Sequence, residues 1–460
     1  MGLFKVREAG STFMTEVLAG ITTFVTMSYI IFANPGILST TGMDFDALVV
    51  VTCLSAALGT FLMALLANYP VALAPGVGLN AYFAFSVVGA MTINGAKVTW
   101  QMALAAVFIE GVIFIVLTIT SLREKIVNTI PKDLKLGISA GIGFFIAFIG
   151  LQGAGLVANS DATLVQLGSL KIGSISFGTP EAPNFSVSFL NDVFAKIPSV
   201  PALLALLGIL IIAVLTALKI KSSLLIGILA VTGAGIGLGM VEMPKEIVSM
   251  PPSIEPLFFK LDFSLIKSPD FWIVVFTFFF VDFFDTVGTL VGVCSRSNLL
   301  DENGNLPRAK GALMADALAT VAGAVMGTST VTSYVESSSG VAQGGRTGLT
   351  SVVTALLFLA AMFFAPLIRI VPSYATAPAL IIVGVYMMIS LKDINYDDWT
   401  ELVPAFLGFV MMPLTYSIST GIEIAIISYV IIKIFTARFK DISFLMLFLA
   451  VLFTAKELFL

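Results

Sequence analysis

The sequence predicts an all-α, polytopic membrane protein, and its composition and its apolar segments both lead to that fold class. Of 460 residues, 58% are hydrophobic and 11% are charged, and the mean hydropathy is +1.03. A soluble domain carries about 25% charged residues. Because about 20 apolar residues span the hydrocarbon core as a helix, a chain of this length has room for a dozen or more crossings.

The apolar segments divide the chain into fourteen predicted crossings. Two of them, residues 74–90 and 328–345, are rich in glycine and interrupted by proline or hydroxyl residues. We expect each of these two to be a short strand followed by a half-helix. The continuous apolar windows cover residues 13–33, 46–67, 101–120, 132–152, 200–218, 222–240, 271–293, 309–326, 348–368, 375–391, 401–417 and 420–436.

The basic residues predict the orientation of the chain. With the N-terminus and the end of segment 14 in the cytoplasm, most of the 24 Lys and Arg residues fall on cytoplasmic loops, as the positive-inside rule expects. The broken segments are the third and the tenth, at equivalent places in two halves of seven segments. Because seven is odd, the second half must be inverted, which is the layout of an inverted-repeat transporter. The apolar tail at residues 441–460 is left unassigned, either lying on the membrane or packed against the bundle.

The composition excludes several classes of function. A net charge of −4 without a basic stripe argues against nucleic acid as a partner. The chain has no histidine, and its two cysteines, Cys53 and Cys294, lie far apart within or beside apolar runs. We therefore expect no metal site, no cofactor and no catalytic nucleophile, and we do not expect an enzyme.

Acidic residues inside the predicted spans are the candidate functional groups, because a charge in the bilayer is costly and usually has a role. Asp282 and Asp285, in FFFVDFFDTVGTL, are three residues apart and share one face of the eighth segment. In the tenth segment, Glu336 follows the hydroxyl-rich stretch TSTVTS, which contains Thr332. These two segments therefore supply carboxylates and hydroxyls near the membrane midplane.

The third segment supplies an amide and an aromatic ring. In ALAPGVGLNAYFAF, the proline and the glycines break the helix, and Asn80 and Phe83 follow. Carboxylates accept hydrogen bonds from ring N–H groups, an amide both donates and accepts, and aromatic rings cover π faces. Such a site suits a flat, polar, neutral heterocycle. The expected substrate-binding residues are Asp285, Glu336, Asn80, Phe83 and Thr332, and the expected proton-coupling residues are Asp282, Asp285 and Glu336.

Each of these residues also has a structural interpretation. Asp285 can bond a neighbouring helix, and Asp282 is equally well interpreted as a brace or as part of a proton path. Glu336 can cap the tenth half-helix, and Asn80 can tie a broken backbone together. Among the other charged residues of the spans and loops, Asp316 is interpreted as a brace, Arg346 as a cytoplasmic anchor, and Glu110 has no motif that assigns it.

Four long motifs resemble the nucleobase-cation symporter-2 family, in its AzgA-like purine permease branch. They are GITTFVTMSYIIFANP, VALAPGVGLNAYF, FVDFFDTVGTL and MADALATVAGAVMGTSTVTSYVESSSGVAQGGRTGLTS, and the similarity runs over nearly the whole chain. The resemblance implies import of purine bases with protons across the plasma membrane. It matches Asp285 to the family's eighth-segment acid, Glu336 to its tenth-segment glutamate and Asn80 to its third-segment asparagine. The histidines expected in uracil and xanthine permeases are absent from this sequence. The resemblance therefore implies that carboxylates alone carry the proton.

The resemblance also implies two domains and a set of partners. Residues 1–120 and 246–370 would form a core domain of segments 1–4 and 8–11, and residues 121–245 and 371–440 a gate domain of segments 5–7 and 12–14. The expected partners are a purine base, a proton and the lipid bilayer, and a homodimer is left open. Which of hypoxanthine, guanine and adenine is preferred is not predicted.

Two other functions compete with purine import. An anion exchanger of the same inverted-repeat fold would bind a carboxylate or an inorganic anion at the facing half-helix N-termini. Carboxylates at Asp285 and Glu336 argue against that alternative, because they would repel the anion. A passive channel is the second alternative, and proton uptake stimulated by substrate would separate a carrier from a channel.

Overall fold

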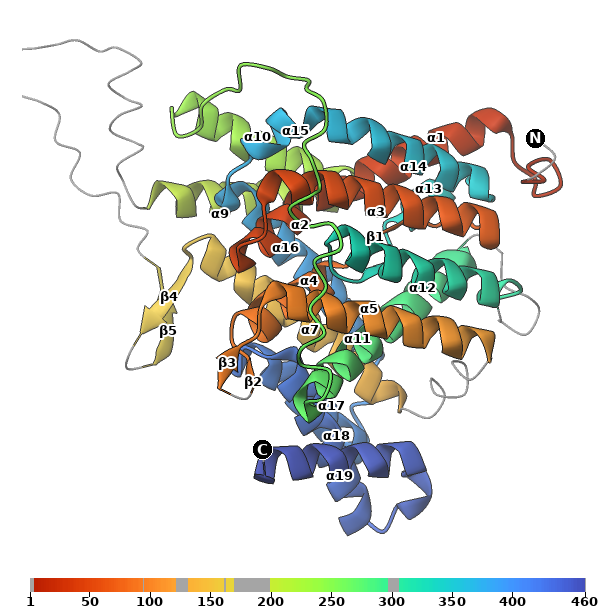
Figure 1. Ribbon diagram of the computed structural model, residues 1–460, viewed down its shortest axis with the longest axis vertical. Coiled ribbons are helices and arrows are strands. Elements are labelled where there is room, and N and C mark those ends of the chain that lie inside the picture. Colours follow the sequence, from red (N-terminus) through yellow and green to blue (C-terminus); the bar gives the residue numbers. More distant parts are fainter. Residues whose placement is uncertain are drawn as a thin grey trace, which may run out of the picture.

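A computed structural model describes residues 4–93, 95–120, 131–160, 163–168, 199–296 and 306–459. Long helices dominate it, and many of them run side by side as a bundle (Figure 1). Within these ranges, nine helices or continuous helical runs are long and apolar enough to cross a membrane. Helical structure forms in each predicted window, whereas the count of fourteen crossings stays a prediction.

Polar residues at the start of the helices fix where several of them begin. Thr12, Asp44 and Thr99 each accept a hydrogen bond from a backbone N–H in the first turn of the helix that follows. The first half contains α1 (Phe13–Met27), α2 (Ile30–Leu38), η1 (Ser39–Thr41), α3 (Phe45–Leu66), β1 (Leu73–Pro75), α4 (Val77–Ala81), the π-helical η2 (Tyr82–Val88), β2 (Thr92–Ile93), β3 (Ala96–Lys97), α5 (Trp100–Ile119), α7 (Lys132–Gly153), β4 (Val157–Ser160), β5 (Leu164–Leu167), α9 (Val200–Ala217) and α10 (Ser223–Gly237).

As they flank β1 in the first half, long helices flank a short strand, β6, in the part of the second half that the structure describes. Its elements are α11 (Pro269–Arg296), α12 (Ala309–Met326), β6 (Val331–Ser333), α13 (Ser337–Ala342), α14 (Gly348–Ala361), η3 (Met362–Phe364), α15 (Ala365–Arg369), α16 (Ser373–Met388), η4 (Ile389–Asp393), α17 (Trp399–Leu414), α18 (Ile418–Phe435), η5 (Phe439–Asp441) and α19 (Phe444–Phe459). The apolar tail that the sequence left unassigned is therefore a helix, and it packs against α18.

The helices pack in two groups. In one group, α3 packs against α12 and α14, α5 against α11 and α12, and α1 against α13 and α14. In the other, α7 packs against α16 and α17, α9 against α10 and α16, and α17 against α18. Glycines allow the close approach of α7: a Cβ added at Gly143 would lie 2.7 Å from the carbonyl oxygen of Gly384, and one at Gly137 the same distance from that of Ala405. Small residues at such contacts are the usual means of packing helices in membranes.

Candidate substrate site

The two broken segments meet at a pair of short antiparallel strands. β1 pairs with β6 in the register Leu73 with Ser333, Ala74 with Thr332 and Pro75 with Val331. Each strand leads into a short helix, α4 after β1 and α13 after β6. The predicted strand and half-helix are present in both segments, and the strand pairing places the two half-helices at one crossing point.

Threonines from the preceding helices hold the strands. Thr60 of α3 accepts from the backbone N–H of Leu73 at 2.9 Å and donates to its carbonyl oxygen at 3.0 Å. Thr320 of α12 donates to the carbonyl oxygen of Val331 at 3.0 Å. Because irregular backbone in a bilayer needs partners for its polar groups, these hydroxyls stabilise the break at equivalent places in the two halves.

The side chains of β6 and of the residues just before it bond to four other elements, α2, α4, α5 and α11. The pairs are Thr328 with Asn34 at 3.2 Å, Ser329 with Asn80, Thr330 with Glu110 at 2.9 Å and Thr332 with Thr286 at 2.8 Å. All eight side chains are buried. The hydroxyl-rich stretch thus joins helices from both halves of the chain, and Thr332 lies inside this network.

Asn80 is fully buried on α4, and its two amide atoms differ in their surroundings. Its Oδ1 accepts from the hydroxyl of Ser329, whereas its Nδ2 has no hydrogen-bond partner among the described residues. A buried amide N–H group without a partner costs free energy. The arrangement leaves a donor at the crossing point for a ligand that carries an acceptor.

Asp282 and Asp316 both lie near one hydroxyl, that of Thr286, which also bonds β6. The Oγ1 of Thr286 lies 2.8 Å from Oδ1 of Asp316, 3.4 Å from Oδ1 of Asp282 and 2.8 Å from Oγ1 of Thr332. A hydroxyl donates one hydrogen bond at a time, so the shorter contact makes Asp316 the acceptor. The structure therefore places Asp282 and Asp316 close to β6. Asp316 accepts a hydrogen bond from Thr286, which agrees with its interpretation as a brace.

Glu336 occupies the position just before α13, and it does not cap that helix with its side chain. Instead, its Oε1 accepts from the hydroxyl of Tyr29 at 2.9 Å. Tyr29 is buried and sits at the start of α2, in the predicted first segment. The side chain of Glu336 thus stands at the start of α13 without a capping hydrogen bond, and Tyr29 is a partner that the sequence did not single out.

Asp285 is half-buried on α11, and its carboxyl group lies within electrostatic range of those of Glu336 and Asp316. The structure thus brings together Asp285, Glu336 and the strand network. Phe83 is fully buried on η2, and its ring packs against that of Phe278 with centroids 6.3 Å apart. Its ring contact in the structure is with α11, and its role as a stacking face for a substrate stays a prediction.

Two charged residues that the sequence did not connect, Glu16 and Arg346, hold the loop after α13 through backbone hydrogen bonds. Glu16 of α1 is fully buried and accepts from the backbone N–H groups of Arg346 at 3.0 Å and of Thr347 at 3.3 Å, and from the hydroxyl of Thr350 at 2.5 Å. The guanidinium of Arg346 donates to the carbonyl oxygens of Val341 and Gly345, each at 2.7 Å. Glu16 therefore supplies acceptors at the start of α14, and Arg346 supplies donors at the end of α13.

Replacing Glu16 with Ala is expected to lower the melting temperature of the purified protein. The change leaves the two backbone N–H groups and the Thr350 hydroxyl without an acceptor, and each buried group of this kind costs about 1–3 kcal/mol. The measurement is thermal unfolding in detergent. The matched control is Glu8→Ala, which removes an exposed carboxylate shortly before α1 together with its surface ion pair to Lys5; because exposed ion pairs contribute little, the melting temperature should stay nearly unchanged. Equal melting temperatures for the two variants would contradict the bracing role of Glu16.

Comparison with known proteins identifies the family. Residues 14–424 match the family model Xan_ur_permease, described as the permease family. The chain belongs to this permease family, the nucleobase-cation symporter-2 family. Its members are permeases rather than enzymes, as the sequence predicted.

Relatives of this permease cover its whole length. It is 48% identical to the putative permease MJ0326 of Methanocaldococcus jannaschii, over 99% of this chain and 98% of the relative. It is 44% identical to the adenine permease AdeP of Escherichia coli, over 100% of this chain and 96% of that protein. It is also 44% identical to the guanine/hypoxanthine permease PbuG of Bacillus subtilis, over 99% of each chain. The predicted family is confirmed.

Solved structures show the fold of this permease. The transmembrane domain of the cyanobacterial bicarbonate transporter BicA matches with a TM-score of 0.62 at 18% identity, over 90% of this chain and 97% of that one. SLC26A9 matches with a TM-score of 0.59 at 12% identity, over 95% of this chain and 68% of that one. The prediction of an all-α, polytopic protein with the inverted-repeat transporter fold is confirmed.

Proposed function

We propose that this permease imports purine nucleobases, hypoxanthine and guanine and also adenine, by proton symport across the plasma membrane. The observation that carries the proposal is the full-length similarity to an adenine permease and to a guanine/hypoxanthine permease, at 44% identity each. The site geometry adds chemistry that fits. Asp285 and Glu336 offer acceptors for the ring N–H groups of a base, and Asn80 offers a donor for a ring nitrogen or a carbonyl oxygen.

In this proposal, the carboxylates of Asp285 and Glu336 couple transport of the base to transport of a proton. Asp285 and Glu336 lie close together and repel each other when both are charged. A proton on one of them relieves that repulsion, and a base that accepts or donates at this site then binds to the protonated pair. Asp282, whose Oδ1 lies 3.4 Å from the hydroxyl oxygen of Thr286, is proposed as a second proton-accepting group.

The two packing groups of helices support a core and a gate domain. The group that contains α1, α3, α5, α11, α12, α13 and α14 corresponds to the proposed core, and the group that contains α7, α9, α10, α16, α17 and α18 to the proposed gate. Alternating access then moves the crossed half-helices, with the base, against the gate. The cytoplasmic N-terminus and the homodimer belong to the same proposal.

The anion-exchange alternative is less well supported. Its support is the likeness to bicarbonate and SLC26 transporters, which at 18% and 12% identity extends to the fold alone. An anion at the start of α13 would lie beside the carboxylate of Glu336. The carboxylate of Asp285 lies near that of Glu336. Two negative charges at this position oppose an anion, whereas a neutral base is not repelled.

Uptake in cells that lack their own nucleobase permeases tests the proposal. Radiolabelled hypoxanthine, guanine, adenine and uracil are supplied separately, with and without a protonophore, and with bicarbonate as the anion control. Purine uptake that the protonophore abolishes is the expected result. Purine uptake that ignores the protonophore would overturn proton symport, and uptake of none of the purines would overturn the substrate class.

A further inference from the structure

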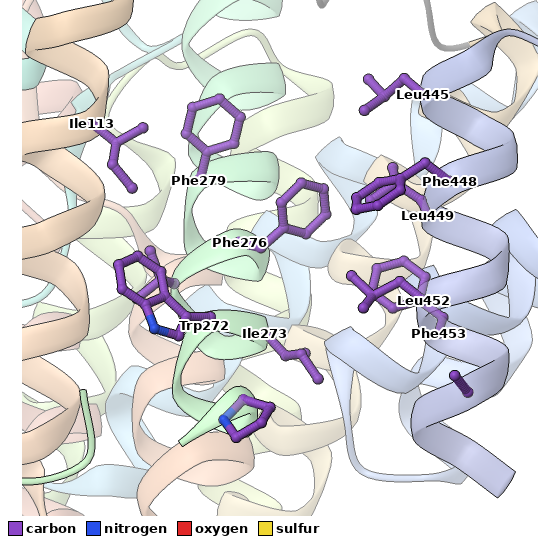
Figure 2. A pocket seen from close by; sticks show the side chains of 13 residues that line it. Ile113, Trp272, Ile273, Phe276, Phe279, Leu445, Phe448, Leu449, Leu452 and Phe453 are labelled. Atoms are coloured by element: carbon purple, nitrogen blue, oxygen red, sulfur yellow. The ribbon is translucent and has the colours of Figure 1, made fainter. Parts of the chain in front are cut away.

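An apolar cavity of about 610 Å³ lies between α5, α11 and α19, and none of the predicted substrate residues lines it (Figure 2). All of its lining side chains are aliphatic or aromatic, apart from a proline and an alanine. The one polar atom among these side chains, Nε1 of Trp272, donates to the carbonyl oxygen of Ile266 at 2.9 Å. The wall therefore offers a ligand no hydrogen bond, and a cavity of this kind stays dry and binds apolar molecules.

The cavity is a slot that follows the two helices. Its lining residues run from Pro269 to Phe279 on α11 and from Leu445 to Ala455 on α19, and their side chains point toward one another across the gap (Figure 2). Ten residues of helix rise about 15 Å, which is half of a hydrocarbon core of about 30 Å. The slot is therefore about as deep as one leaflet, which is the depth that one lipid acyl chain covers.

α19 has the composition of a helix immersed in hydrocarbon. A helix that lies in the interface, by contrast, needs a charged or polar face along its length. No charged residue occurs from Ile442 to Ala455, and the charged residues of α19, Lys456 and Glu457, are confined to its last turn. Its exposed face is as apolar as its packed face, with Val451 62% exposed and Leu449 2% exposed. Phe448 at the rim of the slot is 55% exposed. The lining is therefore continuous with the surface that faces the acyl chains of the bilayer.

We propose that this slot is a binding site for one acyl chain of a membrane phospholipid, held between α11 and α19. An empty apolar gap forfeits the dispersion contacts of the side chains that line it, and the bilayer supplies acyl chains beside it. α19 packs against α18, whereas α11 carries Asp285 and packs against α5. The bound acyl chain would thus fill the gap between α19 and α11, the helix that carries Asp285.

Photo-crosslinking of the purified full-length protein tests the site. The protein is reconstituted in phosphatidylcholine vesicles that contain a trace of phosphatidylcholine with a diazirine on one acyl chain. After illumination, the adducts are located by mass spectrometry of the peptides. We expect several-fold more adducts on Trp272, Phe276 and Phe453, which line the slot, than on Val451, which faces bulk lipid on the same helix.

A slot-filling variant and a matched control separate the bound chain from bulk lipid. Leu449→Phe combined with Ala455→Phe adds two rings at the wall of the slot and should reduce the adducts there several-fold. Val451→Phe makes a comparable change outside the lining and should leave them unchanged. Equal labelling of the slot and of Val451 in the wild type would overturn the proposal, and so would a labelled Val451 beside an unlabelled slot. The wild-type comparison decides the question even where the double variant fails to fold.

Discussion

Replacing Asp285 with Asn is expected to reduce proton-driven purine uptake by about tenfold or more, which corresponds to about 1.4 kcal/mol or more in the rate-limiting step. Asn has nearly the same shape as Asp, but it has no charge and cannot exchange a proton with the neighbouring Glu336. Its amide also presents donors where a base N–H group needs an acceptor. The measurement is the initial rate of hypoxanthine uptake, with and without the protonophore, in cells that lack their own permeases.

Asp270→Asn is the matched control for this variant. Asp270 lies in the first turn of the same helix, α11, and takes no part in the strand network. Its replacement should leave uptake near the wild-type rate. Western blots of membranes measure how much of each variant is inserted, so that a low rate can be separated from low abundance. Unchanged, protonophore-sensitive uptake by Asp285→Asn would remove this residue from the site, although the family membership would stand.

The sequence located the break in each repeat, because the signals for it are local. Proline and glycine before Asn80, and hydroxyl residues before Glu336, interrupt apolar helices within a few positions of the break itself. The acids were found for a similar reason, since a charge in an apolar run is conspicuous. A strand followed by a short helix is what the structure shows in both segments.

The partners of these residues were not predicted, because they depend on how distant segments pack. Tyr29 donates a hydrogen bond to Glu336, which lies 307 positions further along the chain. Thr330 donates a hydrogen bond to Glu110, from which it is 220 positions distant. No local pattern selects one buried tyrosine or glutamate among several. The contact of Phe83 with Phe278 of α11 is another partner that no local pattern indicated, and its role as a stacking face stays a prediction.

Replacing Gly340 with Ala is expected to reduce purine uptake about as strongly as the change at Asp285. Gly340 lies in α13, one turn after Glu336, and faces α1. A Cβ added there would overlap the hydroxyl of Thr23 and lie 2.7 Å from the carbonyl oxygen of Ala19. Overpacking of this kind costs about 1–3 kcal/mol, and it moves α13 away from α1. Because Glu336 moves with α13, its hydrogen bond to Tyr29 should lengthen or break.

Gly237→Ala provides the control, because a Cβ at Gly237 on α10 meets no atom within 4 Å. Ala is favoured over Gly in a helix by about 1 kcal/mol, so this variant should unfold at the same temperature or a higher one and transport normally. For Gly340→Ala we expect a lower melting temperature together with reduced uptake. If Gly340→Ala were as stable as Gly237→Ala but transported poorly, the displacement of Glu336 alone would account for the loss. Normal uptake by Gly340→Ala would mean that the close contact of α13 with α1 is not needed for transport, which would contradict a substrate site built on the start of α13.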